Sequence, residues 1–322
     1  MAERCATIRY EEEFTTNERG LQIFTCRWIP VNEDRKSLVF LCHGYAMECS
    51  VTMAGTGTRL AKAGFVVHGM DYEGHGKSDG LQGYIWNFQT LVDDCSEYFT
   101  SICETAENKD KKRFLLGDSM GGAVAIMLHR KNPSFWNGAV LVAPMCKISD
   151  EMKPRPIVIS FLEKLSKVIP KWKIVPAMDI VENGIKDPHH RQRVRDNPLC
   201  YKGKPRLLTG KELLAASNDI ENNMDEISMP FLVVHGGDDI VTDASVSQLL
   251  YDRASSSDKT FKLYPGMWHA ITYGEPIENI NIVFSDIISW LNERSLVGDE
   301  ILSEIEQKTS CDVQTNPPLK SD

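Results

Sequence analysis

The sequence has no excess of positive charge. Its 36 Lys and Arg residues stand against 45 Asp and Glu residues, which gives a formal net charge of −9. Nucleic-acid binding without sequence preference depends on clustered Lys and Arg that displace counterions from phosphates. The average charge therefore argues against a nucleic-acid partner.

Paired cysteine motifs and long apolar runs are also absent. The nine cysteines are odd in number, scattered, and never spaced Cys-x-x-Cys, so neither a disulfide framework nor a zinc site is expected. The first residues show no apolar core of a secretory signal. No apolar stretch approaches the ~18 to 20 residues of a membrane span. We therefore expect a reducing compartment, most simply the cytosol.

The 322 residues, 42% of them hydrophobic and 25% charged, have a globular composition. Short apolar, β-branched runs alternate with amphipathic stretches, which predicts an α/β fold with a mostly parallel sheet covered on both faces. The expected strands are 37–42, 65–70, 113–116, 138–143, 231–235 and 260–264. The expected helices are 58–63, 90–106 with Thr90 as N-cap, 121–130 and 277–291.

One region, residues 145–229, breaks this alternation and is called the cap segment below. It contains no buried-strand pattern, and stretches 157–169 and 211–224 are expected to be helical. Residues 145–215 hold 15 Lys and Arg against eight Asp and Glu, a local +7 that leaves −16 for the rest of the chain. We predict a helical insertion at 145–229 in an α/β core made of 1–144 and 230–297. Residues 298–322 are expected to form a disordered tail.

Two segments match Gly-x-Ser-x-Gly, the pattern around a nucleophilic serine: 117–121, centred on Ser119, and 76–80, centred on Ser78. Such a serine sits on a strained turn between a strand and a helix, and small neighbours let the two elements approach. An apolar run precedes Ser119 and a helix-forming stretch follows it, whereas Gly and aromatic residues follow Ser78. We therefore predict Ser119 as the nucleophile. A phosphate loop at Ser78 is excluded because it requires Gly where Asp71 stands.

A serine nucleophile needs a histidine to take its proton and a carboxylate to orient that histidine. In α/β-hydrolase arrangements the acid and then the histidine follow the serine, each at the carboxyl end of a strand. His269 follows the expected strand 260–264 and is favoured over His235, which we interpret as buried or structural. Asp238 and Asp239 share the preceding turn. Asp239 is favoured as the acid, and Asp238 is expected to bond its own backbone.

A tetrahedral oxyanion also needs preorganised hydrogen-bond donors. One is the backbone N–H after the nucleophile, at Met120. The other is expected in the loop after strand 37–42, where Tyr45 would donate its backbone N–H. His43 is expected to hold this loop.

Together these features resemble the monoacylglycerol lipase-like branch of the α/β-hydrolase superfamily, and most closely its plant members, which include caffeoylshikimate esterase. The likeness runs from about Tyr10 to Arg294. Besides the triad it includes these motifs: His43-Gly44-Tyr45, Asp71-x-x-Gly74-His75-Gly76-x-Ser78, Ala143-Pro144-Met145-Cys146-Lys147-Ile148, Glu151-Met152-Lys153-Pro154 and Pro265-Gly266-Met267-Trp268-His269.

The resemblance implies an α/β-hydrolase fold whose helical cap covers the active site. It implies hydrolysis of monoacylglycerol-like or related small esters through an acyl-enzyme, with no metal or organic cofactor. It implies five site residues: the triad Ser119, Asp239 and His269, and the oxyanion donors Tyr45 and Met120. The sequence departs from the family at Asp118, where members commonly carry Glu or His, and this shorter acid bears on acyl preference more than on catalysis.

Several alternatives stay open at this level. The same acyl-enzyme would serve an acyltransferase, a hydroxycinnamoyl (caffeoylshikimate-type) esterase or a lysophospholipase. A non-catalytic ligand receptor is less expected because the triad is uninterrupted.

The cap segment has three interpretations. It is a lid whose cations are merely solvated, a peripheral contact with an anionic membrane, or a site at which Arg or Lys binds an anionic substrate. The expected location is accordingly cytoplasmic or peripherally membrane-bound.

Overall fold

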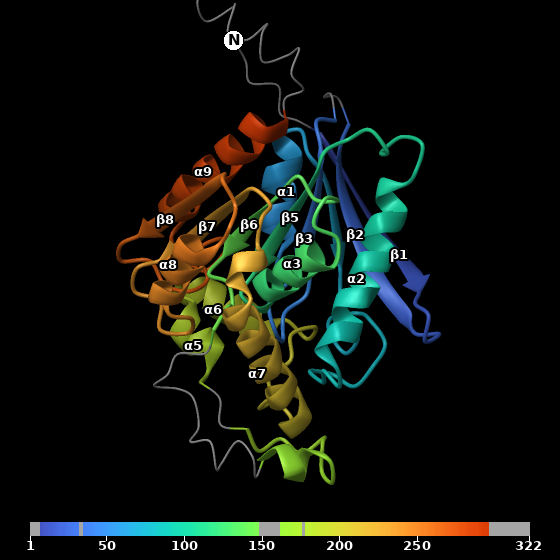
Figure 1. The fold of residues 1–322 in the computed structure, drawn as a ribbon, viewed down its shortest axis with the longest axis vertical. Coiled ribbons are helices and arrows are strands. Elements are labelled where there is room, and N and C mark those ends of the chain that lie inside the picture. The colour runs from blue at the N-terminus through green and yellow to red at the C-terminus, as the bar shows by residue number, and fades with distance from the viewer. Residues whose placement is uncertain (1–6, 32–34, 148–161, 176–177, 296–322) are drawn as a thin grey trace, which may run out of the picture.

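The computed structural model describes residues 7–31, 35–147, 162–175 and 178–295. An eight-stranded sheet forms its centre, in the order β1-β2-β4-β3-β5-β6-β7-β8 (Figure 1). β2 pairs antiparallel with β1 and β4, and all other pairs are parallel. The predicted α/β class with a mostly parallel sheet is confirmed. The strands are β1 (Ile8–Thr16), β2 (Gln22–Pro30), β3 (Leu38–Cys42), β4 (Val66–Met70), β5 (Arg113–Asp118), β6 (Gly138–Val142), β7 (Phe231–Gly236) and β8 (Lys259–Tyr264).

Helices cover both faces of the sheet (Figure 1). Side chains of α2, α3 and α8 pack in the core cluster on one face, and side chains of α1 and α9 pack in the cluster on the other. The helices in the described part of the chain are α1 (Ala54–Lys62), α2 (Phe88–Cys103), α3 (Met120–Lys131), α5 (Ile180–Gly184), α6 (Pro188–Asp196), α7 (Leu207–Asn222), α8 (Ala244–Arg253) and α9 (Ile277–Ser295), with a 3-10 helix η1 (Met224–Glu226).

β3 illustrates why continuous apolar runs become central strands. Leu38 and Phe40 point into one core cluster, while Val39 and Leu41 point into the other. Successive side chains of a strand alternate between faces, so a strand covered on both sides needs apolar residues at every position. Burying each large side chain contributes about 1.5–3 kcal/mol.

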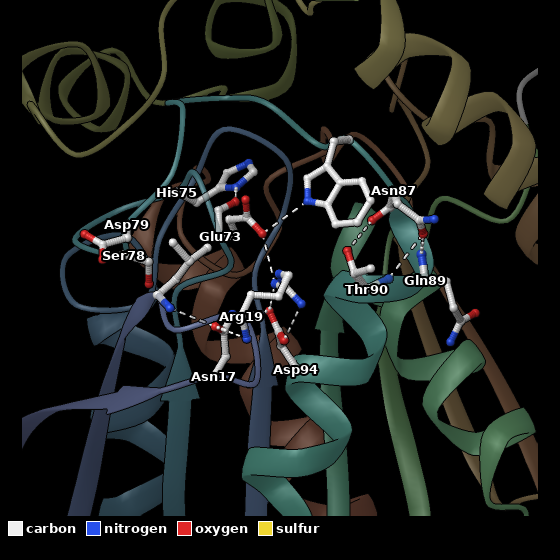
Figure 2. A network of polar contacts seen from close by, with 12 residues as sticks. Asn17, Arg19, Glu73, His75, Ser78, Asp79, Asn87, Gln89, Thr90 and Asp94 are labelled. Atoms are coloured by element: carbon white, nitrogen blue, oxygen red, sulfur yellow. Dashed lines mark hydrogen bonds and ion pairs between the residues drawn. The ribbon is translucent and has the colours of Figure 1, made fainter.

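The hairpin of β1 and β2 is not predicted from the sequence. β1 is a largely exposed edge strand with three consecutive Glu residues, so it lacks the apolar pattern of a buried strand. Arg19, in the turn between the two strands, ties the hairpin to the rest of the molecule. Figure 2 shows it between Asp94 of α2, at 2.6 Å, and Glu73 in the loop after β4, at 2.9 Å. Asn17 adds a hydrogen bond to the same Asp94 carboxylate, at 3.1 Å. The network fastens the edge of the sheet to α2.

The start of α2 corrects one expectation. The helix is capped by Asn87, whose side chain accepts the backbone N–H groups of Gln89 and Thr90 (Figure 2). Thr90 is therefore not the N-cap. Asn is a strong capping residue, and starting at Phe88 buries that aromatic ring in the core.

The cap segment connects β6 to β7 and contributes α5, α6 and α7, of which α5 and α6 lie at the lower end of the sheet in Figure 1. Of the expected helix 157–169, residues 162–166 are helical and 157–161 lie outside the described residues. The Glu151-Met152-Lys153-Pro154 motif and the tail 298–322 also lie outside them. The end of α7 joins the main core through Ala216 and Ile220. Among the described residues, no helix is long and apolar enough to cross a membrane.

Candidate active site

Ser119 occupies the turn between β5 and α3. Its φ of 54° and ψ of −115° are unusual for a residue other than Gly, and such strain costs on the order of 1–3 kcal/mol. The neighbouring positions leave no room for side chains: a Cβ on Gly117 would collide with the backbone of Gly121, and one on Gly121 would collide with the carbonyl of Cys42. The turn therefore has the close strand-to-helix approach of a nucleophile elbow.

Ser78, the centre of the second Gly-x-Ser-x-Gly match, has a different environment. Its hydroxyl donates to the carbonyl of Asp71 at 2.6 Å and accepts the backbone N–H of Phe24 at 2.9 Å. These bonds tie the loop after β4 to β2. The serine is engaged in holding a loop and does not stand on a strand-to-helix turn.

Asp239 and His269 meet at the carboxyl ends of neighbouring strands. Asp239 follows β7, His269 follows β8, and the Nδ1 atom of His269 lies 2.7 Å from Oδ2 of Asp239. Asp238 is exposed, and its backbone N–H donates to the carbonyl of Met267. Its side chain forms no hydrogen bond with a described residue, so the expected bond to its own backbone is wrong; Asp239 accepts the backbone N–H groups of this turn. Only Asp239 is therefore placed to orient His269. Ser119 follows β5, which is separated from β7 by β6 alone. Ser119, Asp239 and His269 therefore all lie at the carboxyl ends of the parallel strands.

The ionisation of this pair follows from its surroundings. Burial alone would raise the pKa of Asp239, yet hydrogen bonds from His235 and His269 and their charges hold it well below its ordinary value. Burial alone would lower the pKa of His269, but the hydrogen bond and charge of Asp239, with a smaller contribution from Asp118, raise it. A carboxylate that stays ionised beside an imidazole that accepts a proton suits a general base.

Three residues besides His269 contact the Asp239 carboxylate, and none of them is predicted as its partner. His235, expected to be structural, is buried, and its Nε2 lies 3.0 Å from Oδ2 of Asp239. The Thr242 hydroxyl lies 2.8 Å from the same oxygen, and Oδ1 accepts the backbone N–H groups of Val241 and Thr242 at 2.7 and 3.1 Å. In the sequence, the only indication of the bonds from Val241 and Thr242 is that these residues lie two and three positions after Asp239. Together they hold the carboxylate in one orientation.

The predicted oxyanion donors lie on both sides of the elbow. Met120 is the first residue of α3, and a Cβ on Gly44, next to Tyr45, would come within 3.5 Å of Ser119 Cβ. Neither the Met120 nor the Tyr45 backbone N–H forms a hydrogen bond with a described residue. Both donors are therefore available to an oxyanion.

His43 supports the loop that carries Tyr45, as expected from the sequence. Its Nδ1 lies 2.8 Å from the carbonyl of Gly44, and its Nε2 accepts the backbone N–H of Tyr72 at 3.2 Å. Burial holds the pKa of His43 well below its ordinary value. The ring is therefore neutral, with the proton on Nδ1.

Asp118, directly before the nucleophile, is a buried carboxyl at the end of β5. Burial raises its pKa to about 6, an effect reduced by the charge of His269 and increased by the charge of Asp239. Asp118 thus adds a second titratable acid whose charge acts on His269.

The family described as Hydrolase_4 (serine aminopeptidase, S33) matches residues 33–276. Caffeoylshikimate esterase from Arabidopsis thaliana is 33% identical over 288 residues, which cover 89% of this chain and 86% of that protein. Monoglyceride lipase from Homo sapiens is 29% identical over 279 residues, which cover 87% and 89% of the two chains.

Among solved structures, a soluble variant of monoglyceride lipase from Saccharomyces cerevisiae in complex with a substrate analog has a similar fold. The TM-score is 0.77 at 19% identity, covering 92% of this chain and 98% of that one. The extent of the family match and the similarity to the Arabidopsis esterase agree with the elbow and the Asp-His pair. The chain belongs to the Hydrolase_4 family of α/β-hydrolases and is a serine ester hydrolase.

Proposed function

We propose that this protein hydrolyses monoacylglycerol-like esters, with Ser119 as nucleophile, His269 as base and Asp239 as the orienting acid. The observation that carries the proposal is the Asp239–His269 contact of 2.7 Å, at the same end of the sheet as a serine in the strained elbow conformation. Relatives named monoglyceride lipase, similar over most of their length, support the substrate class.

The proposed reaction has two halves. Ser119 Oγ attacks the ester carbonyl while Nε2 of His269 takes the hydroxyl proton, and the Met120 and Tyr45 N–H groups stabilise the oxyanion. The tetrahedral intermediate collapses, the bond to the leaving alcohol breaks, and His269 gives that alcohol its proton. Water then attacks the acyl-enzyme, His269 takes its proton, and the fatty acid leaves as Ser119 regains its hydrogen.

A panel of esters tests the substrate class. We expect turnover of 1-monoacylglycerols to exceed that of lysophospholipids and short aryl esters by at least about ten-fold in kcat/KM. Ser119→Ala should lower kcat by about 10³-fold or more, because no covalent intermediate forms. The matched variant Ser78→Ala should retain the wild-type preference among esters. An equal loss in both variants, or labelling of Ser119→Ala by a fluorophosphonate, would contradict the mechanism.

Hydroxycinnamoyl esters are the second candidate substrates. The observation in their favour is the higher identity to the caffeoylshikimate esterase, 33% against 29% for the human lipase. The panel therefore includes caffeoylshikimate, and a kcat/KM for it above that for monoacylglycerol would replace the first proposal with the second.

The part of the cap segment at residues 162–175, with Met178, supports a proposed contact with anionic membranes. Val168 is 78% exposed and Trp172 is 59% exposed, with Ile174 and Met178 also exposed. Four lysines accompany them: Lys164, Lys167, Lys171 and Lys173. Exposed apolar side chains beside cations are typical of segments that enter the interface of an anionic bilayer.

Vesicle sedimentation tests this contact. Each Lys near an anionic surface contributes about 1 kcal/mol, so Lys167→Gln/Lys171→Gln should weaken binding to phosphatidylserine vesicles roughly thirty-fold at low salt. The matched control is Lys109→Gln/Lys112→Gln, in the body of the protein. Equal recovery of wild type on neutral vesicles would contradict the electrostatic contribution.

A further inference from the structure

A cavity lies where the cap segment meets the body of the protein. Its volume is about 200 Å³. The walls come from α1 and the loop before it, from α6, and from the loop that runs from His269 into α9. Its lining residues include Thr272 and Tyr273, three and four positions after His269.

Three basic side chains line this cavity: Arg59 of α1, and His190 and Arg193 of α6. Among the described residues that line it there is no Asp or Glu. His190 and Arg193 are three residues apart on one helix and therefore share a face. The cavity brings together basic side chains from two elements that are distant in the sequence.

These cations lack the partners that neighbouring arginines have. Arg191 and Arg195, also on α6, pair with Glu182 at 2.6 and 2.8 Å. The side chains of Arg59, His190 and Arg193 form no ion pair or hydrogen bond with a described residue; the Arg59 guanidinium lies over the ring of Phe284, at 5.1 Å. The two guanidinium charges therefore have no ion-pair partner among the described residues.

A buried acid, Glu48, lies behind the cavity wall but forms no ion pair with these side chains. Glu48 accepts five hydrogen bonds, among them the Thr52 hydroxyl at 2.9 Å and the Asn197 amide at 3.0 Å. Because Thr52 and Asn197 also line the cavity, they stand between the carboxylate and the basic side chains. The Glu48 side chain is therefore held by donors within its own loop and by Asn197.

We infer that this cavity binds a small organic phosphate, held by Arg59, Arg193 and His190. Two guanidinium groups and an imidazole match the three oxygens and double charge of a phosphate monoester better than a single carboxylate, which one arginine can satisfy. The volume is sufficient for a phosphate on a short carbon skeleton. The apolar walls at Val51, Val194 and Ile280 would contact that skeleton.

Occupancy would link the cap segment to the catalytic loop. The phosphate would join α6 to α1, and the skeleton would lie against Thr272 and Tyr273, which follow His269. A ligand that binds only the folded, assembled form stabilises that form. The inference concerns binding and therefore stands independently of the proposed ester substrate.

The test uses the full chain with glycerol 3-phosphate as probe, and with glycerol or sodium chloride at matched ionic strength as references. We expect a saturable rise in melting temperature with glycerol 3-phosphate alone, and calorimetry should give a Kd that Arg193→Gln raises at least about ten-fold. Arg59→Gln should have a similar effect. Arg193 is exposed and lacks a described partner, so its variant is expected to fold even where loss of the Arg59–Phe284 contact impairs folding.

Arg195→Gln is the matched control, because it removes the same charge from the same helix outside the cavity; it should bind the probe as wild type does. Comparing turnover of 1-oleoylglycerol and its 3-phosphate then distinguishes two sources of the phosphate. If Arg193→Gln lowers turnover of the phosphate ester alone, the phosphate belongs to a substrate. If turnover of both esters is unchanged, the phosphate belongs to a separate ligand. An equal melting shift with sodium chloride, or unaltered binding in Arg193→Gln, would overturn the inference.

Discussion

Apolar side chains are buried in strand β5 but exposed in the part of the cap segment around Trp172. Phe114, Leu115 and Leu116 of β5 are almost completely buried and lead directly into the nucleophile turn. Val168 and Trp172 are largely exposed and lie among lysines. Apolar side chains therefore form the packed core that supports the nucleophile turn in β5, and an accessible surface in the cap segment.

The largest expected effect concerns the rigid region. Asp239→Asn should lower kcat by about 10³- to 10⁴-fold, because an amide cannot hold the same tautomer of His269 or stabilise its protonated ring. Steady-state kinetics on a monoacylglycerol measures the loss. The neighbouring variant Asp238→Asn, at an exposed position without a bond to His269, should keep activity within about three-fold. A comparable loss in both variants would assign the effect to the turn and not to the acid.

The next effect compares burial in the two regions directly. Phe114→Ala should lower the free energy of unfolding by about 3–5 kcal/mol, because it leaves a cavity beside Trp290 in the core. Trp172→Ala should change the free energy of unfolding by less than about 1 kcal/mol, because that ring is largely exposed. Urea unfolding at constant slope measures both changes. A loss above 3 kcal/mol for Trp172→Ala would mean that the ring is part of the packed core.

The smallest effect is a shift in pH dependence. The charge of Asp118 helps to raise the pKa of His269, so Asp118→Asn should move the acidic limb of kcat/KM to lower pH. The maximal kcat should change less than about ten-fold, since Asp118 takes no proton from the substrate. An acidic limb that stays in place would show that Asp118 does not influence His269.

The same substitution has a predicted effect on stability. Because burial raises the pKa of Asp118 to about 6, its carboxyl favours folding most at low pH, and this contribution is lost as pH rises through about 6. Asp118→Asn should therefore gain stability relative to wild type as pH rises from 4 to 8. Urea midpoints across this range measure the change, and a relative loss with rising pH would contradict the sign.

Much of the sheet follows from local sequence. Strands 37–42 and 231–235 are recognisable because residues 38–42 and 231–234 are all apolar, as a strand covered on both faces requires. β1 is not recognisable, because its Glu-rich pattern has no buried face to reveal it. Thr90 is the wrong N-cap for α2 because the capping residue, Asn87, lies outside the amphipathic pattern from which the helix is predicted.

By itself, the sequence determined the strand-to-helix turn at Ser119 and the order of acid and base behind it. These features depend on consecutive residues, namely apolar runs, small neighbours and turn residues, whose effects are local. Only the tertiary structure decided that Asp239, rather than Asp238, contacts His269, and that His235 and Thr242 contact the same carboxylate. It alone placed Arg59 beside Arg193. Such contacts depend on how separate elements pack, and the spacing of residues along the chain does not specify how far apart their side chains lie in space.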